Sequence, residues 1–124
     1  MHFCLLHTTK KFEEVNDKLS AMIDLKRPTL IIGDFNFCYM DSARNLTKDF
    51  LKHLDFKQIV ERPTHIQGNL IDQAHLRDTH ENLKARAFLH SKYYSDHKSL
   101  AIILKTGKLY ANLKHIFNNL ICFS

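Results

Sequence analysis

The stretch that most restricts the fold is Leu30-Ile31-Ile32-Gly33-Asp34-Phe35-Asn36, where a short apolar run leads directly into polar residues. Three apolar residues in succession leave neither face of a strand for water, so we expect a buried strand at 30–32. Gly33 is expected to let the chain leave that strand in a backbone conformation that other residues disfavour. Asp34 and Asn36 lie two positions apart, so they would point to one side of the sheet if the strand geometry continued.

Asp34 and Asn36 have two interpretations. A carboxylate only accepts hydrogen bonds while an amide also donates them, so the pair suits a metal-binding or water-activating site opposite a phosphate. Alternatively, Asp and Asn are ordinary loop-forming residues after a strand. The stretch on its own favours neither interpretation over the other.

The remaining elements alternate as in an α/β protein. Apolar residues recur at spacings of three and four over 12–23 and 47–54, which predicts two amphipathic helices. Because the first elements are a strand, a helix and a strand, we expect an α/β sheet with a helix on one face. The further expected strands are 3–6, a short one within 55–60, 70–76, 85–89 and 100–104. Residues 1–105 then form one domain, followed by a tail at 106–124 that is helical over 109–123.

Composition and charge restrict the class of protein. The 124 residues and the 44% hydrophobic share fit one small globular domain. A formal net charge of +5 favours acidic partners such as nucleic acid, although scattered basic residues also simply keep a protein soluble. The cysteines Cys4, Cys38 and Cys122 form neither a disulfide framework nor a zinc pattern, which favours a reducing, intracellular setting. His75 and His80 flank Arg77-Asp78 and are expected in a surface turn rather than as a ligand pair.

Several polar residues lie within or beside the expected strands. Asp72 follows Leu70-Ile71, and a carboxylate among apolar residues is costly unless it is paired or metal-bound. Asp96-His97 precedes a buried strand and is either part of a site or a common surface turn. Neighbouring residues on a strand point to opposite sides, so a carboxylate that orients His97 would be Asp72 rather than Asp96. Thr64 is either a phosphate-binding or supporting hydrogen-bond donor, or a plain loop hydroxyl.

These motifs together resemble the carboxy-terminal half of the endonuclease/exonuclease/phosphatase superfamily. The resemblance covers residues 3–104 and rests on motifs in the family's order. They are Gly33-Asp34-Phe35-Asn36, then Pro63-Thr64-His65 with Gly68 and Ile71-Asp72, then Ser95-Asp96-His97. Within the superfamily, Glu61-Arg62-Pro63-Thr64-His65 and Tyr93-Tyr94-Ser95-Asp96-His97 are most similar to the reverse-transcriptase-linked endonucleases of mobile elements in invertebrate genomes.

The resemblance implies a fold and an activity. The family fold is a four-layer α/β sandwich, and its members hydrolyse phosphodiesters with Mg²⁺ or Mn²⁺. By motif, Asp34 would orient or deprotonate the attacking water, and Asn36 would hold the scissile phosphate. Asp96 would contact a metal, and His97 would stabilise the transition state while hydrogen-bonded to Asp72. Thr64 would contact the substrate.

The chain also departs from the family pattern. The family's amino-terminal half supplies a metal-binding Glu and an Asn, and we expect that half to be missing here. Glu13 and Glu14 are expected on an outer helix and cannot replace that Glu. His7 is at best a loose counterpart of a catalytic Tyr or His of the family's middle region. Binding of Mg²⁺ or Mn²⁺ is therefore expected to be impaired.

Three interpretations of the function are open. The chain is either a nuclease domain or fragment, or an inactive remnant with weak affinity for nucleic acid; a lipid or inositol phosphatase of the same superfamily has no specific motif in its favour. The expected partner is nucleic acid, with DNA favoured over RNA, and no membrane. A complementary chain or self-association would cover the exposed sheet. The expected location is intracellular, with the nucleus as one such location.

Overall fold

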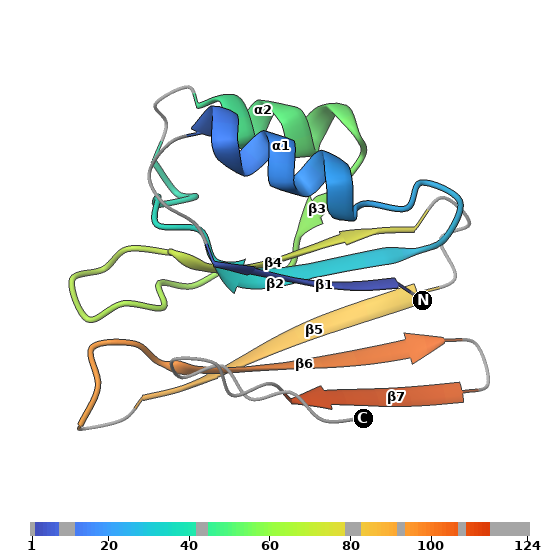
Figure 1. The fold of residues 1–124 in the computed structure, drawn as a ribbon. Helices are drawn as coiled ribbons and strands as arrows, with labels where there is room; N and C mark the ends of the chain where they lie inside the picture. The colour runs from blue at the N-terminus through green and yellow to red at the C-terminus, as the bar shows by residue number, and fades with distance from the viewer. Residues whose placement is uncertain are drawn as a thin grey trace.

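The fold is described by a computed structural model that covers residues 2–7, 12–41, 45–78, 83–91, 94–106 and 109–114. For His7, Phe12, Thr106 and residues 109–114 the backbone alone is described. Within these ranges the chain is a mixed α/β protein with two sheets and two helices (Figure 1). Neither helix in the described part is long and apolar enough to cross a lipid bilayer.

The first sheet has four strands in the order β1-β2-β4-β3. Their bounds are β1 His2–His7, β2 Thr29–Asp34, β3 Lys57–Gln58 and β4 Asp72–Arg77. Strands β1 and β2 are parallel, and helix α1 (Phe12–Met22) connects them, whereas β4 is antiparallel to both β2 and β3. Helix α2 (Leu46–His53) begins at Asn45, whose side chain accepts a hydrogen bond from the Lys48 N–H.

The second sheet has three antiparallel strands in the order β5-β6-β7. Their bounds are β5 Leu83–His90, β6 Ser99–Thr106 and β7 Leu109–Lys114. Along β5 the side chains alternate between half-buried and exposed, because one face of the strand packs on the core and the other faces water. The predicted helices and the strands up to residue 104 are therefore confirmed as elements, with shifted ends.

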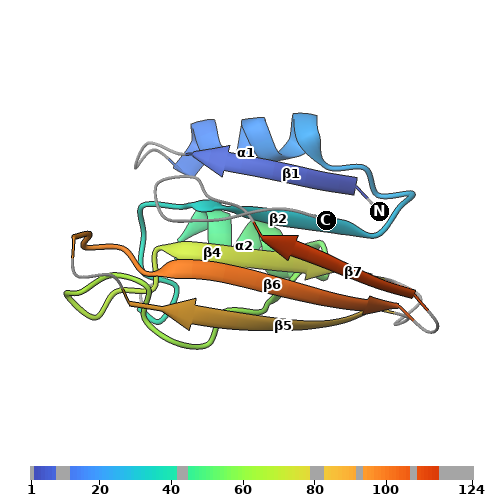
Figure 2. The same cartoon turned by 90° about the horizontal axis from the view of Figure 1, so that it is seen from below.

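Three layers follow from the two faces of the first sheet. Figure 1 shows both helices on one face of this sheet and the second sheet on the other face, and Figure 2 shows the second sheet from below. The alternation of β2 supplies both cores: Ile31 faces the helices, while Leu30 and Ile32 face the second sheet. The core between the sheets is made of Leu30, Ile32, Val60, Leu70, Ala74, Leu76, Leu100, Ile102 and Leu104.

Strand β1 is an edge of the first sheet, with a partner recorded on its β2 side only among the described strands. Cys4 and Leu6 point into the helix-side core, so Phe3 and Leu5 point to the opposite face. Phe3 is 47% exposed and Leu5 is 54% exposed. An apolar stretch of sheet is thus open at this edge, and the partner expected to cover it stays a prediction.

The prediction of a helix over 109–123 is wrong for residues 109–114. Residues 109–114 form β7, which pairs with β6 from Thr106↔Leu109 to Ala101↔Lys114. Leu109, Ala111 and Leu113 alternate with other residues, so the same stretch satisfies a strand pattern, and the open edge of β6 selects that alternative. Residues 115–124 of the predicted tail helix lie outside the described residues, as does Cys122.

Gly33 is required for a reason other than the one expected. It lies inside β2 between Leu6 of β1 and Gln73 of β4, and its φ is not positive. A Cβ atom at this position would lie 1.8 Å from the Leu6 carbonyl oxygen, which is backbone and cannot move aside. The residue that leaves the strand in the left-handed region is instead Asn36, with a φ of 54°.

We expect Gly33→Ala to destabilise the fold far more than Gly68→Ala. The first substitution drives β1 and β2 apart and is expected to cost about 3 kcal/mol. At Gly68 the added Cβ meets open space, and the positive φ of 86° costs about 1 kcal/mol. Urea denaturation of both variants measures the two free energies of unfolding. Equal losses would show that the close approach to Leu6 is unimportant.

Candidate active site

The pairing of β2 with β4 brings two carboxylates together at one end of the first sheet. Asp34, the last residue of β2, is directly opposite Asp72, the first residue of β4. Cross-strand partners share a face, and this face is the one that packs on the second sheet. Both residues are buried, and ligand atoms of Asp34, Asp72 and His97 lie within 4.8 Å of one another. The sequence therefore places an acidic pair between the two layers.

His97 reaches this pair from the segment that precedes β6. That segment is tied to the loop before β4 by two backbone hydrogen bonds, from Ile66 N–H to Asp96 O at 2.9 Å and from Lys98 N–H to Thr64 O at 2.8 Å. His65 and His97 face each other in the resulting short antiparallel bridge. The bridge links the two sheets at the site and fixes the position of His97 against the first sheet.

Asp72 and His97 form the tightest contact of the site. The distance from His97 Nδ1 to Asp72 Oδ2 is 2.6 Å, and the Asp72 side chain is 3% exposed. The pairing expected from strand geometry is therefore present. The ring nitrogen Nδ1 donates to the carboxylate, which leaves Nε2 directed away from Asp72.

The protonation of this pair follows from burial and charge. Burial raises the pKa of Asp72, the nearby Asp34 raises it further, and the hydrogen bond and charge of His97 offset this only in part. Burial alone would lower the pKa of His97. The hydrogen bond and charge of Asp72, with the charges of Asp34 and Asp96, outweigh that effect, so the pKa of His97 is raised. The pair therefore holds its shared proton more firmly than isolated side chains would.

Thr64 supports Asp72 rather than lining a surface. Its side chain is fully buried, and its hydroxyl oxygen accepts hydrogen bonds from the N–H groups of Ile71, at 3.2 Å, and Asp72, at 3.0 Å. A hydrogen bond of the Thr64 side chain also lowers the pKa of Asp72. Thr64 thus supports the backbone at the start of β4 as an acceptor, and the predicted contact of Thr64 with substrate stays a prediction.

Asp34 and Asn36 are linked by a local turn. Strand β2 ends at Asp34, and Asp34 Oδ1 accepts a hydrogen bond from the Asn36 N–H at 2.9 Å. Asn tolerates the left-handed conformation better than most residues, which is consistent with its φ of 54° here. The strand geometry assumed for this pair therefore does not continue, and the carboxylate instead caps the turn that presents Asn36. The role of Asn36 in holding a phosphate stays a prediction.

Asp96 lies beside His65, on the other side of His97 from Asp72. Asp96 Oδ2 is 3.1 Å from His65 Nε2, and Asp96 Oδ1 is 3.9 Å from His97 Nε2. The hydrogen bond from His65 lowers the pKa of Asp96. His65, Asp96 and His97 thus form a second group whose ligand atoms lie within 4.8 Å, and this group shares only His97 with the first.

A buried polar chain beneath the site was missed by the sequence interpretation. His75 Nε2 donates to Gln73 Oε1 at 2.9 Å, and Gln73 Nε2 donates to the carbonyl oxygens of Phe37, at 2.9 Å, and Leu70, at 3.1 Å. This chain anchors the segment that follows Asp34. The expectation that His75 lies in a surface turn is wrong, because β4 continues to Arg77 and its helix-facing positions are covered. The strand alternation along β4, counted from Asp72, could have predicted that the His75 side chain faces the helices.

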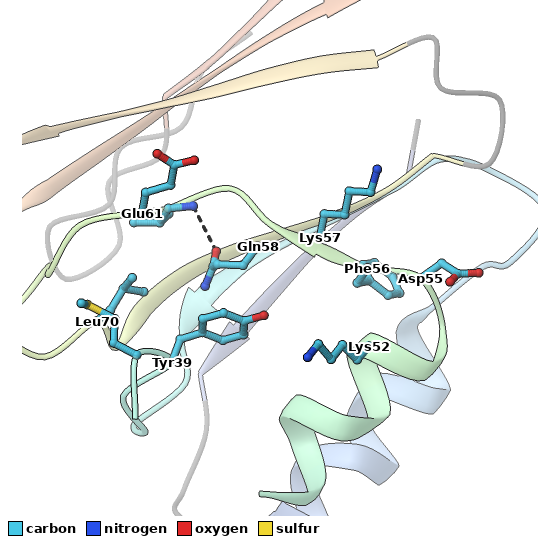
Figure 3. A pocket seen from close by; sticks show the side chains of 10 residues that line it. Tyr39, Lys52, Asp55, Phe56, Lys57, Gln58, Glu61 and Leu70 are labelled. Atoms are coloured by element: carbon cyan, nitrogen blue, oxygen red, sulfur yellow. Dashed lines mark hydrogen bonds between the residues drawn. The ribbon is translucent and has the colours of Figure 1, made fainter. Parts of the chain in front are cut away.

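A cavity among the described residues lies away from these groups. It has a volume of about 780 Å³ and lies between the end of α2, strand β3 and Tyr39 (Figure 3). Side chains of both charges line it, namely Lys52, Lys57, Asp55 and Glu61. None of its lining residues belongs to the two acid–histidine groups, which are Asp34–Asp72–His97 and His65–Asp96–His97. Strongly interacting titratable groups mark a functional site better than volume does, so the acid–histidine groups are the candidate site.

The remaining expected site residues are placed as follows. Glu13 and Glu14 are exposed on α1, in the outer layer, as expected. Tyr93 and His80 lie outside the described residues, as does the side chain of His7. Comparison of the chain with protein-family models, with curated proteins and with solved structures finds no match. The candidate site is therefore defined by the geometry of this chain.

We expect Asp72→Asn to lower the pKa of His97. The substitution removes the negative charge that outweighs burial, so the remaining desolvation favours the neutral imidazole. A ¹H NMR titration of the His97 ring reports this pKa directly. The exposed Asp17→Asn on α1 is the matched control and should leave the titration unchanged. An unchanged pKa in Asp72→Asn would contradict the pairing.

We expect His75 to reduce stability in acid. The ring is fully buried, and burial lowers its pKa from 6.5 to about 3. Between about pH 6.5 and pH 3, His75 is therefore protonated in the unfolded chain and neutral in the folded chain. Stability should fall over this window by up to about 1.4 kcal/mol per pH unit from this residue alone.

The comparison that isolates this effect is His75→Gln against the exposed His53→Gln on α2. Urea denaturation between pH 7 and pH 4 gives the slope of unfolding free energy against pH for each protein. His75→Gln should have a shallower acid slope than the unsubstituted protein, and His53→Gln should retain the original slope. Identical slopes in all three would contradict the interpretation.

Proposed function

We propose that this protein hydrolyses phosphodiester bonds of nucleic acid with the aid of Mg²⁺ or Mn²⁺. The observation that supports this most is the convergence of Asp34, Asp72 and His97 from two sheets, with the 2.6 Å contact between His97 and Asp72. A carboxylate can serve as a general base in such a reaction, and a carboxylate-fixed histidine can stabilise the charge that develops on the phosphate.

We also propose that the chain belongs to the endonuclease/exonuclease/phosphatase superfamily. The three motifs Asp34-Phe35-Asn36, Ile71-Asp72 and Asp96-His97 are in the order of that family, and residues from all three take part in the two adjoining groups. Helices on one face of a sheet and a second sheet on the other are consistent with part of a four-layer sandwich. A mobile-element endonuclease remains the proposed subclass.

The donor chemistry of the first group fits Mg²⁺. Asp34 and Asp72 offer carboxylate oxygens, and Mg²⁺ in phosphoryl-transfer sites is typically held by one or two carboxylates with water and substrate phosphate. Bound there, the ion would polarise the phosphoryl oxygen and stabilise developing negative charge. Both carboxylates also hold hydrogen bonds within the protein, Asp72 with the His97 ring and Asp34 with the Asn36 N–H, so both would be held in position beside the ion.

Several residues of the candidate site have proposed roles in hydrolysis. Asp34 would accept a proton from the attacking water, with its orientation fixed by the Asn36 N–H. His97 would place positive charge against the phosphate, since its raised pKa favours the imidazolium. Asp72 would hold the His97 ring in one tautomer, and Thr64 would hold Asp72. Asn36 would bind a phosphate oxygen.

Basic residues beside the site support nucleic acid as the substrate. Lys98 follows His97 directly and is hydrogen-bonded through its backbone to Thr64. Arg62, two residues before Thr64, is exposed. Lys and Arg side chains at such positions contact the phosphate backbone without regard to sequence. The net charge of +5 also favours binding of the negatively charged phosphate backbone.

A plasmid-nicking assay with added Mg²⁺ tests the proposal. We expect nicking that is abolished by EDTA and lowered roughly 100-fold or more by His97→Ala and by Asp34→Ala, because each removes a group that acts on the transition state. The exposed residues His53→Ala and Asp17→Ala are matched controls and should retain the full rate.

Two results would overturn this proposal in different ways. Nicking that survives both His97→Ala and Asp34→Ala would remove these residues from the reaction. Complete inactivity of folded protein with either Mg²⁺ or Mn²⁺ would favour the alternative, an inactive module that only binds nucleic acid. A gel-shift measurement with duplex DNA at low salt then measures that affinity.

A further inference from the structure

We propose that His65, Asp96 and His97 form a binding site for a zinc-class divalent ion. This site adjoins the Asp34 and Asp72 carboxylates proposed above for Mg²⁺ and includes Asp96, the residue to which the family resemblance assigns a metal contact. Each residue offers one ligand atom, and these atoms lie within 4.8 Å of one another. The proposal stands on the geometry of these three side chains. It does not require that the chain hydrolyse nucleic acid.

The ligand atoms lie near, but not at, the separations that they would have around a bound tetrahedral ion. Around Zn²⁺ with bonds of about 2.1 Å, ligand atoms are separated by about 3.4 Å. Here Asp96 Oδ2 is 3.1 Å from His65 Nε2, and Asp96 Oδ1 is 3.9 Å from His97 Nε2. The two contacts use different oxygens of Asp96, so the carboxylate must rotate to bring a single oxygen close to both nitrogens. One ligand atom from each of the three residues already lies within 4.8 Å of the others, which leaves side-chain rotations to close the site.

The donor set selects the class of ion. Two imidazole nitrogens and one carboxylate oxygen suit Zn²⁺, Co²⁺ or Ni²⁺, whereas Mg²⁺ prefers oxygen ligands throughout. The histidine side chains are mostly buried, 14% and 16% exposed, while Asp96 is 59% exposed. Three protein ligands with one solvent-facing side leave a fourth position for water or another ligand.

The second nitrogen of His97 already has the partner that metal-bound histidines use. Asp72 accepts from Nδ1 at 2.6 Å, which fixes the ring and raises the basicity of Nε2. Nε2 is the atom that faces Asp96. A buried carboxylate behind the ligating ring therefore pre-orients one of the three ligands.

The backbone holds the two histidines side by side. They face each other in the short bridge between the 64–66 and 96–98 segments, and their ring centroids are 5.2 Å apart. His65 Nδ1 accepts a hydrogen bond from the Gln67 N–H at 3.2 Å, so Nε2 carries the proton in the metal-free ring. Metal binding at Nε2 would move that proton to Nδ1 and release the N–H of Gln67, which is an exposed residue.

Titration of the purified chain with Co²⁺ in the absence of nucleic acid tests the proposal. We expect one equivalent to bind with a visible absorption spectrum of nitrogen- and oxygen-ligated Co²⁺, Zn²⁺ to displace it, and millimolar Mg²⁺ to leave it in place. His65→Ala and Asp96→Asn should each weaken Co²⁺ binding by roughly 10-fold or more, since each removes one of three ligands. The exposed His53→Ala should bind Co²⁺ like the unsubstituted protein.

Asp96→Asn keeps the proposal testable if His65→Ala does not fold, because Asp96 is exposed and the change preserves its shape. Unchanged Co²⁺ affinity in either folded variant, or equal loss in His53→Ala, would overturn the proposal. Displacement of Co²⁺ by Mg²⁺ at similar concentration would also overturn it. Since no substrate is present, the outcome is independent of whether the nicking assay succeeds.

Discussion

The antiparallel pairing of β2 with β4 is the constraint on which the candidate site depends. This register places Asp34 opposite Asp72 and at the same time turns Ile32 and Ala74 toward the second sheet. A slip of one residue would exchange the two faces of β4. Asp72 would then face the helices, and His75 would face the second sheet. The hydrophobic pattern that stabilises the fold and the pairing of the two carboxylates are therefore specified by the same register.

That register creates an electrostatic problem that His97 offsets. Two buried carboxylates lie opposite each other, and both burial and the charge of Asp34 penalise the ionised form of Asp72. His97 supplies a hydrogen bond and compensating positive charge, and the Thr64 hydroxyl satisfies the backbone at the start of β4. Both partners come from the bridge that joins the two sheets. The site is thus complete only when the layers are packed, which couples its chemistry to the tertiary fold.

The side-chain orientations that follow from strand periodicity could be predicted from the sequence. Features that depend on close approach between neighbouring strands could not. Alternation along strands was enough to favour Asp72 over Asp96 as the carboxylate that orients the His97 ring, and the close contact of Asp72 with Nδ1 is present. The requirement for Gly33 could not be predicted, because it arises from the Leu6 carbonyl of a neighbouring strand. For 109–114 the helical and strand patterns coexist, and only the open edge of β6 distinguishes them.

His97 belongs to both acid–histidine groups, and its two nitrogens cannot be exchanged. Nδ1 is held by Asp72, so Nε2 is the atom that remains for an external ligand. A phosphate oxygen and a zinc-class ion would both require it, and they require opposite states: a protonated ring for the phosphate and a deprotonated Nε2 for the metal. If both proposals hold, binding of such an ion through His65 and Asp96 excludes the protonated state of His97 on which the proposed hydrolysis relies. The same contact with Asp72 that prepares His97 for one role therefore prepares it for the competing one.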